Sequence, residues 1–193
     1  MGFQRFVATT PGHLVRKVAI DYLRFGYWRY KQLEIPQEKD PCLVDDKLID
    51  FYDITTCGMK RLRRRQKGLA NVVFVRFRHS FILLATEGEH PAFNQLKSYD
   101  LRFVPLHFCG YSVGAVNHKP CICICRLEWE KIKYRFGKIG LHNRGDVERK
   151  LNALPYYNFP GVRKQKIQLV NQVNRRRKKA GLPLITLTLP QYS

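Results

Sequence analysis

Acidic side chains are scarce in this chain of 193 residues. It has 15 Asp and Glu against 35 Lys and Arg, which gives a formal net charge of +20 at pH 7 and an isoelectric point near 10.0. So large a charge of one sign opposes compaction and is normally offset by a polyanionic partner. We therefore expect nucleic acid as the partner, and an anionic membrane surface is the weaker alternative.

Long apolar runs are also missing. No run approaches the roughly 18 apolar residues of a membrane-spanning helix, because the longest uncharged apolar stretch is Phe81 to Ala85. The first residues, MGFQR, do not start an apolar signal segment, so secretion is not expected. The six cysteines include no CxxC pair, which favours a reduced, cytoplasmic protein.

The sequence has no internal repeat, no Gly/Ser linker, no Walker loop and no GxSxG motif. Hydrophobic residues make up 45% of the chain, which is enough for a packed core. We therefore expect one domain over residues 1–193. Its N-terminal part, 1–56, is expected to be helical, and 57–193 to hold a basic helix, a sheet and C-terminal helices.

Capping signals mark the first helices. Thr10-Pro11 and Asp40-Pro41 each place a capping side chain before a proline at the first helical position. Apolar residues at helical spacing follow both, and Gly26 ends the first run. The second helix is expected to end near Asp53, and a short basic helix over 56–67 to end at Gly68.

The hydrophobic pattern then changes its period. Val- and Phe-rich stretches at 71–78 and 81–86 predict a hairpin, and 101–109, 111–116 and 121–127 predict three more strands. Helical spacing returns after Leu127, and a last helix after Pro160-Gly161 carries Ile167, Val170 and Val173 as its apolar stripe. The order predicts an α+β fold, an antiparallel sheet of about five short strands flanked by N-terminal and C-terminal helices.

The positive charge increases toward the C-terminus. Residues 1–50 carry 8 basic and 7 acidic side chains, whereas 151–193 carry 8 basic side chains and no acidic one. The first dense run follows the helix of 41–52, in a layout similar to a helix-turn-helix. The cations that we expect on phosphates here are Lys60, Arg61, Arg63, Arg64, Arg65 and Lys67. A solvated helix leading into the sheet is the alternative.

The second dense run lies in the last helix and comprises Arg175, Arg176, Arg177, Lys178 and Lys179. Five consecutive helical residues advance by about 100° each, so they cover the whole circumference and cannot all face a core. Cations also interact favourably with a helix C-terminus, but five exceed what capping needs. We therefore expect phosphate contacts from this run too.

An aromatic and basic stretch occupies residues 22–31. Tyr27, Trp28 and Tyr30 are its candidates for stacking on unpaired bases. The competing interpretation is that these rings pack in the core, since a small domain needs its large aromatics there.

Glu87, Glu89 and His90 are the catalytic candidates of the sequence. Two carboxylates and an imidazole at a strand end would suit a divalent metal, Mg²⁺, acting on a phosphodiester. The same residues equally suit a polar turn. Cys121, Cys123 and Cys125 alternate with isoleucines and predict a packing face rather than a metal site.

The sequence thus predicts a small, basic, cytoplasmic nucleic-acid-binding protein without a cofactor. RNA or a ribonucleoprotein is favoured over DNA, because base-reading side chains are sparse in the first basic run and aromatic residues are plentiful. The alternative is a metal-dependent or histidine-dependent nuclease or processing factor of a mobile element or a defence system.

Overall fold

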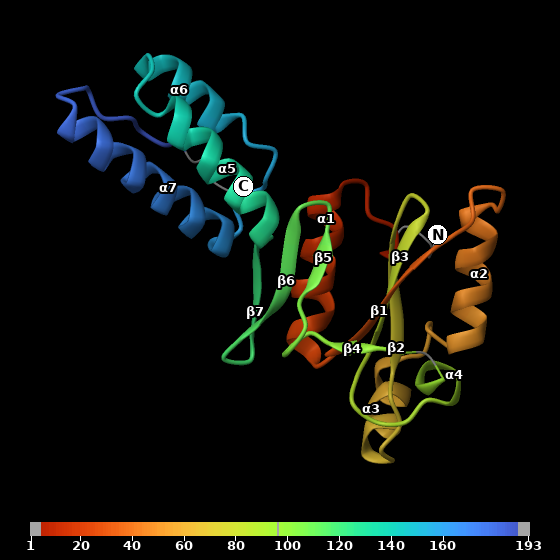
Figure 1. The fold of residues 1–193 in the computed structure, drawn as a ribbon. Helices are drawn as coiled ribbons and strands as arrows, with labels where there is room; N and C mark the ends of the chain where they lie inside the picture. Colours follow the sequence, from red (N-terminus) through yellow and green to blue (C-terminus); the bar gives the residue numbers. More distant parts are fainter. Residues whose placement is uncertain (1–4, 96, 189–193) are drawn as a thin grey trace. The chain divides into compact units, whose positions relative to one another are not determined.

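We describe the fold from a computed structural model, which covers residues 5–95 and 97–188 (Figure 1). The predicted α+β class is confirmed, with helices beside two antiparallel sheets of four and three strands. The chain forms two compact units. One comprises residues 1–108 and 113–120, and the other comprises 109–112 and 121–193, within the limits of the described ranges.

The first unit contains four strands of one sheet and most of the shorter helices. Its elements are α1 (Pro11–Arg16), the π-helical η2 (Lys17–Tyr22), the 3-10 turn η3 (Leu23–Phe25), β1 (Arg29–Glu34), α2 (Pro41–Tyr52), α3 (Gly58–Gln66), β2 (Val72–Phe77), β3 (Ser80–Ala85), α4 (Pro91–Asn94) and β4 (Tyr99–Asp100). The strand order is β2-β3-β1-β4. The sheet thus begins with the predicted hairpin, β2 and β3.

Both predicted caps form as expected. The Thr10 hydroxyl accepts from the backbone N–H of His13, and the Asp40 carboxylate accepts from that of Cys42. Gly26 ends the first helical run with a φ of 89°, in the left-handed region that favours glycine, and turns the chain into β1.

The N-terminal part, residues 1–56, for which we expected helices, also contains the strand β1. This strand lies between β3 and β4, and its residues 29–34 pair with 80–85 of β3. Because β2 and β3 are buried along nearly their whole length, this hairpin forms the buried part of the sheet.

The outer edge of β2 is covered by the segment that precedes α1. Arg76 donates its backbone N–H to the carbonyl of Phe6 and accepts from the N–H of Ala8. The rings of Phe6 and Phe74 stack with centroids 5.1 Å apart. On the same strand, the buried Arg76 guanidinium forms a two-pronged ion pair with Asp45 of α2. These contacts fix α2 and the segment of residues 6–8 to β2.

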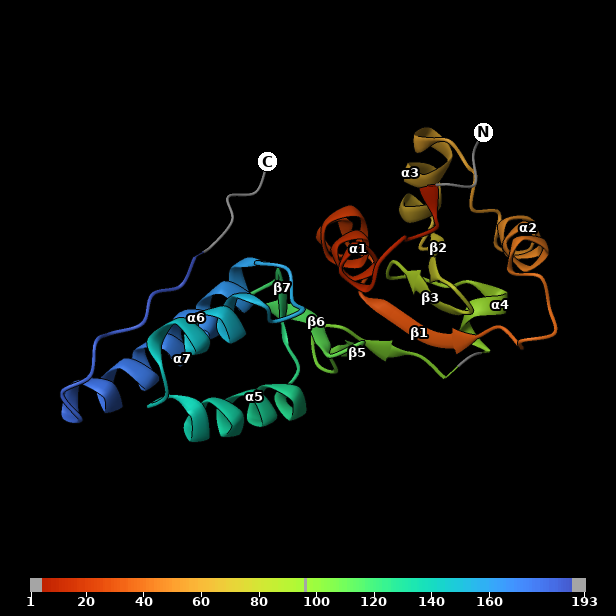
Figure 2. The same ribbon diagram turned by 90° about the horizontal axis from the view of Figure 1, so that it is seen from above.

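The remaining strands form the sheet β5-β6-β7 and lead into the C-terminal helices. Their bounds are β5 (Leu106–Phe108), β6 (Tyr111–Val116), β7 (Lys119–Ile124), α5 (Arg126–Ile139), α6 (Arg144–Asn152) and α7 (Pro160–Lys179). The hairpin of β6 and β7 contributes residues to both units. In the second unit α5 and α7 pack together and run in the same direction (Figures 1 and 2).

The buried stripe of α7 differs from the predicted one. Ile167 is 41% exposed, and Val170 is only half-buried, so the expected stripe is wrong except for Val173. The residues that face the core instead follow the helical period and are Val162, Lys166, Leu169, Val173 and Arg177. Two of the five positions are therefore filled by cations.

Both buried cations are satisfied by oxygen acceptors of their own unit. Lys166 donates to the carbonyl of Tyr156 at 2.9 Å and to the side-chain oxygen of Asn158 at 2.8 Å, and burial lowers the pKa of its ammonium group. Arg177 is 1% exposed and donates to three backbone carbonyls, those of Gly140, His142 and Pro183. These hydrogen bonds hold the loops before α6 and after α7 against the helix.

Two of the strand cysteines lie on one side of β7, as expected, and they are half-buried, whereas Ile122 and Ile124 of the same strand are fully buried. The sulfur atoms of Cys121 and Cys123 lie 3.4 Å apart on one side of β7. Burial, followed by the neighbouring thiol, raises the pKa of Cys123 to about 12, so this thiol remains protonated at neutral pH. Within the ranges that the structure describes, no helix is both long and apolar enough to cross a bilayer.

Candidate nucleic-acid interface

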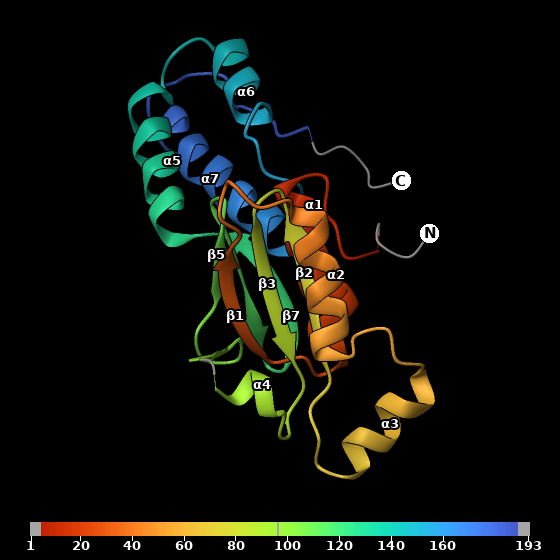
Figure 3. The ribbon, with the colours of Figure 1, turned by 90° about the vertical axis from the view of Figure 1, so that its right-hand side faces the viewer.

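Helix α3 is the most basic element of the first unit and buries none of its residues. In Figure 3 it projects away from the sheet. Two hydrogen bonds connect it to the rest of the unit. Arg65 donates to the carbonyl of Phe25 at 2.6 Å, and the side-chain amide of Asn71 donates to the carbonyl of Arg61 at 3.1 Å. Because α3 has no buried side, it does not pack as the second helix of a compact helix-turn-helix.

One side of α3 is partly neutralised by a single acid. Lys60 and Arg64, four residues apart, both reach the carboxylate of Asp53, at 2.7 and 3.1 Å. Asp53 ends α2 in the left-handed conformation, with a φ of 49°. These two cations share one negative charge, so this side keeps a net charge of about +1.

A second side of α3 faces solvent. Arg63 and Lys67 are exposed, and neither forms an ion pair with any carboxylate of the described chain. No acidic residue occurs between Asp53 and Glu87 in the sequence. These two side chains are therefore available to a polyanion.

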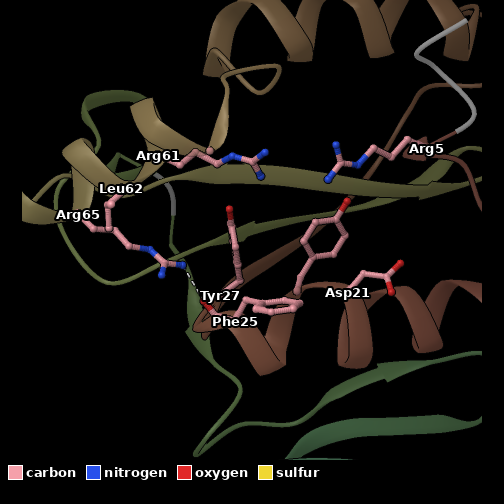
Figure 4. A pocket seen from close by; sticks show the side chains of 9 residues that line it. Arg5, Asp21, Phe25, Tyr27, Arg61, Leu62 and Arg65 are labelled. Atoms are coloured by element: carbon pink, nitrogen blue, oxygen red, sulfur yellow. Dashed lines mark hydrogen bonds between the residues drawn. The ribbon is translucent and has the colours of Figure 1, made fainter.

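The third side of α3 lines a pocket. Gly58, Arg61, Leu62 and Arg65, which repeat at helical spacing, form one wall of a cavity of about 340 Å³ (Figure 4). The opposite wall comes from the first helical run and the residues on either side of it, and consists of Arg5, Asp21, Tyr22, Phe25 and Tyr27. An adjoining cavity of about 180 Å³ shares Arg5, Tyr22 and Arg61.

The pocket gathers positive charge around buried hydroxyl groups. Three guanidinium groups and one carboxylate give it a net charge of about +2. The Nε atom of Arg61 is buried and has no hydrogen-bond partner among the described residues. Burial is the main influence on Tyr22 and raises the pKa of its hydroxyl, which therefore stays protonated and able to donate.

The predicted stacking residues are mostly inaccessible. Tyr27 and Tyr30 are only 4% and 6% exposed, so their rings pack in the core and our expectation that they stack on bases is corrected. Trp28 is half-buried, and the guanidinium of Arg102 lies over its ring. The exposed ring of this stretch is Phe25, at 52%, which the sequence analysis did not select.

In the second unit the cations at the end of α7 separate into two groups. Arg177 is buried, as described above, and its guanidinium is used entirely inside the protein, which corrects its predicted phosphate contact. Arg176 donates to the carbonyl of Gly137 in α5. Arg175, Lys178 and Lys179 are exposed at positions i, i+3 and i+4, so they share one side of the helix.

The acidic residues of this unit lie elsewhere. It has 16 basic and only 4 acidic side chains. The four acids each pair with a cation of α5 or α6, in the pairs Glu128–Lys131, Glu130–Lys133, Asp146–Arg149 and Glu148–Arg144. None of the described carboxylates pairs with α7, so the exposed cations at its end remain uncompensated.

The catalytic candidates do not converge. Glu87 forms an ion pair with Arg102 at 2.7 Å, whereas the ring of His90 caps α4 by accepting from the backbone N–H of Phe93. Burial, followed by the charge of Arg64, lowers the pKa of His90. Glu89 is exposed, and its backbone pairs with the segment after α3. No cluster of three His, Cys, Asp or Glu side chains suited to a metal occurs among the described residues.

Comparison with known proteins adds no family. No protein-family model matches the chain, and no curated protein matches it significantly.

Sequence reasoning found the two basic helices but missed the pocket. Arg5 and Arg61 are 56 positions apart, and no local pattern joins them. The available signal was the spacing of Gly58, Arg61, Leu62 and Arg65, which puts these four residues on one side of the helix.

Proposed function

We propose that this protein binds single-stranded RNA through phosphate contacts made by α3 and by the C-terminal end of α7. The observation that carries the proposal is the separation of charge in the second unit. All four of its acids are paired on α5 and α6, whereas Arg175, Lys178 and Lys179 face solvent with no described carboxylate beside them. Uncompensated surface cations grouped on one helix side suit a phosphate backbone.

RNA is favoured over duplex DNA because of the exposed rings and the composition of α3. Phe25 and Tyr134 are 52% and 67% exposed, and unpaired bases stack on such rings. The solvent side of α3 carries no Asn, Ser or Thr that would read base edges. The larger partner we expect is a ribonucleoprotein that contains such RNA.

A reducing compartment fits this assignment, and we propose the cytoplasm. The structure has free thiols at Cys42, Cys57, Cys121, Cys123 and Cys125. Free thiols are normally maintained in reducing compartments.

A salt titration tests the phosphate mechanism. On the solvent side of α3 and at the end of α7, five exposed cations have no described carboxylate or carbonyl partner, namely Arg63, Lys67, Arg175, Lys178 and Lys179. If each neutralises one phosphate of a single strand, the logarithm of the affinity falls with the logarithm of salt with a slope of about −3.5. Between 50 and 200 mM salt the affinity for a labelled RNA would then fall about 100-fold. A slope near zero in fluorescence anisotropy would contradict the mechanism.

The same assay with single-stranded DNA and duplex DNA of matching sequence tests the choice of ligand. We expect the RNA strand to bind most tightly. Tightest binding of the duplex would mean that stacking on exposed rings does not contribute.

A further inference from the structure

The pocket beside α3 has features that a continuous phosphate contact surface does not need. It is a concave site of about 340 Å³, near the lower end of the roughly 300–1,000 Å³ of ligand pockets. A cavity of this size suits one terminal nucleotide better than a strand passing through it. Its walls come from two separate parts of the chain, α3 and the residues up to Tyr27.

The guanidinium groups of Arg5 and Arg61 point toward one another across this cavity (Figure 4). Two like charges that converge repel each other unless an anion lies between them. The buried Nε of Arg61 has no partner among the described residues. Arg5 forms no ion pair with a described acid, and its one side-chain contact in the pocket is a hydrogen bond to the Tyr22 hydroxyl. Both side chains therefore have donors to offer to a ligand.

The charge of the site distinguishes between kinds of phosphate. With Arg65 and Asp21 included, the pocket carries about +2. A phosphate monoester carries a charge of about −1.5 to −2 at pH 7, because its second pKa is near 6. A phosphodiester inside a strand carries only −1, so a terminal phosphate is the better match.

An aromatic ring lies at the edge of the same pocket. Phe25 lines the cavity and is half exposed, whereas the other two rings, Tyr22 and Tyr27, are almost fully buried and form the wall. A base attached to a bound phosphate can therefore stack on Phe25.

From these contacts we infer that the pocket holds the terminal phosphate monoester of a nucleic-acid strand, with the phosphate between Arg5 and Arg61 and the terminal base against Phe25. This inference rests on the proposed function. It adds that the protein distinguishes strand ends by their phosphorylation. The 5′ and 3′ ends both supply this chemistry, so the experiment has to separate them.

The test uses one single-stranded RNA sequence in three forms, with a 5′-phosphate, with a 3′-phosphate, and with hydroxyl groups at both ends. Affinities for the full-length protein are measured by fluorescence anisotropy with an internal label. We expect one phosphorylated form to bind about tenfold more tightly than the hydroxyl form, since charge-assisted, two-pronged Arg contacts to phosphate are strong. The form that binds more tightly identifies the end.

Variants then locate the preference. In Arg5→Gln the tenfold ratio is expected to fall to near one, and circular dichroism should show an unchanged fold because Arg5 is exposed. Arg61→Gln is expected to do the same, with circular dichroism verifying its fold. The matched control is Arg63→Gln on the same helix but outside the pocket. It should weaken the phosphorylated and hydroxyl strands equally, which leaves their ratio unchanged.

The outcomes separate the two proposals. Equal, salt-dependent binding of all three strands by the unaltered protein would overturn the pocket inference and leave RNA binding intact. A preference for the phosphorylated strand that remains in both Arg5→Gln and Arg61→Gln would mean that the strand end binds outside the pocket. That result would also overturn the pocket inference. Absence of binding to every strand would refute the proposed function, and with it the inference.

Discussion

The exposed cations at the end of α7 allow one question to be tested directly. It is whether RNA affinity depends on the charge of this surface or only on the net charge of the protein. Arg175, Lys178 and Lys179 lie on one side of the helix, and no described carboxylate pairs with them. We expect their replacement by Gln in a triple variant to weaken RNA binding about 100-fold at 0.1 M salt. Each phosphate contact of a single strand contributes about 0.7 to the salt exponent, so three contribute about 2. At 0.1 M salt, an exponent of about 2 corresponds to a factor of about 100 in affinity.

The control removes the same formal charge from the same unit. Lys131, Lys133 and Arg149 are each paired with an acid, so their cationic groups are already partly neutralised. The triple Gln variant at these positions should weaken binding by less than about threefold, because surface pairs of this kind contribute little outside the pair. Anisotropy titrations at several salt concentrations give both the affinity and the salt slope for each protein.

The comparison has a clear refutation. If both triple variants lose affinity and salt slope equally, RNA responds to the net charge of the protein rather than to the end of α7. The assigned surface would then be wrong, even though RNA binding itself would remain.

Two further predictions concern single residues. Asp53→Asn should strengthen RNA binding about two- to fivefold in the same assay, because Lys60 and Arg64 lose the carboxylate they share, and Asn tolerates the left-handed backbone at this position. Unchanged or weaker binding would mean that these cations do not meet the ligand. Arg177→Met should lower the free energy of unfolding by about 3–5 kcal/mol in urea denaturation, since three carbonyls lose their donor. Arg175→Met should change it by less than about 0.5 kcal/mol, and equal losses in the two variants would show that burial of Arg177 is unimportant.

The helices and the central hairpin were predictable because their signals are local. Capping side chains followed by proline mark α1 and α2, and the dense Val and Phe residues mark β2 and β3. Strand β1 was missed since its sequence, RYKQLE, has apolar residues only at Tyr30 and Leu33, which lie on opposite sides of the strand. Its position depends on backbone pairing with β3 and β4, which side-chain patterns do not reveal.

The errors in α7 have a related cause. Sequence reasoning assumes that apolar residues face the core, yet Lys166 and Arg177 occupy core positions because carbonyl groups of neighbouring loops surround them. Those acceptors come from segments distant in sequence, so the cations look like surface residues until the fold is known. The same limitation hid the pocket, whose arginines meet only through tertiary structure.

The segment of residues 5–8 belongs both to the pocket beside α3 and to the cover over the edge of β2. It supplies Arg5 to the pocket and, through Phe6 and Ala8, covers the outer edge of β2. An uncovered strand edge is a template for pairing with another chain. Detachment of this segment would therefore remove the Arg5 guanidinium from the pocket. It would also expose the edge of β2 to pairing with another chain. A ligand bound to Arg5 would stabilise the attached state of residues 5–8. Resistance to aggregation should therefore increase with occupancy of the pocket.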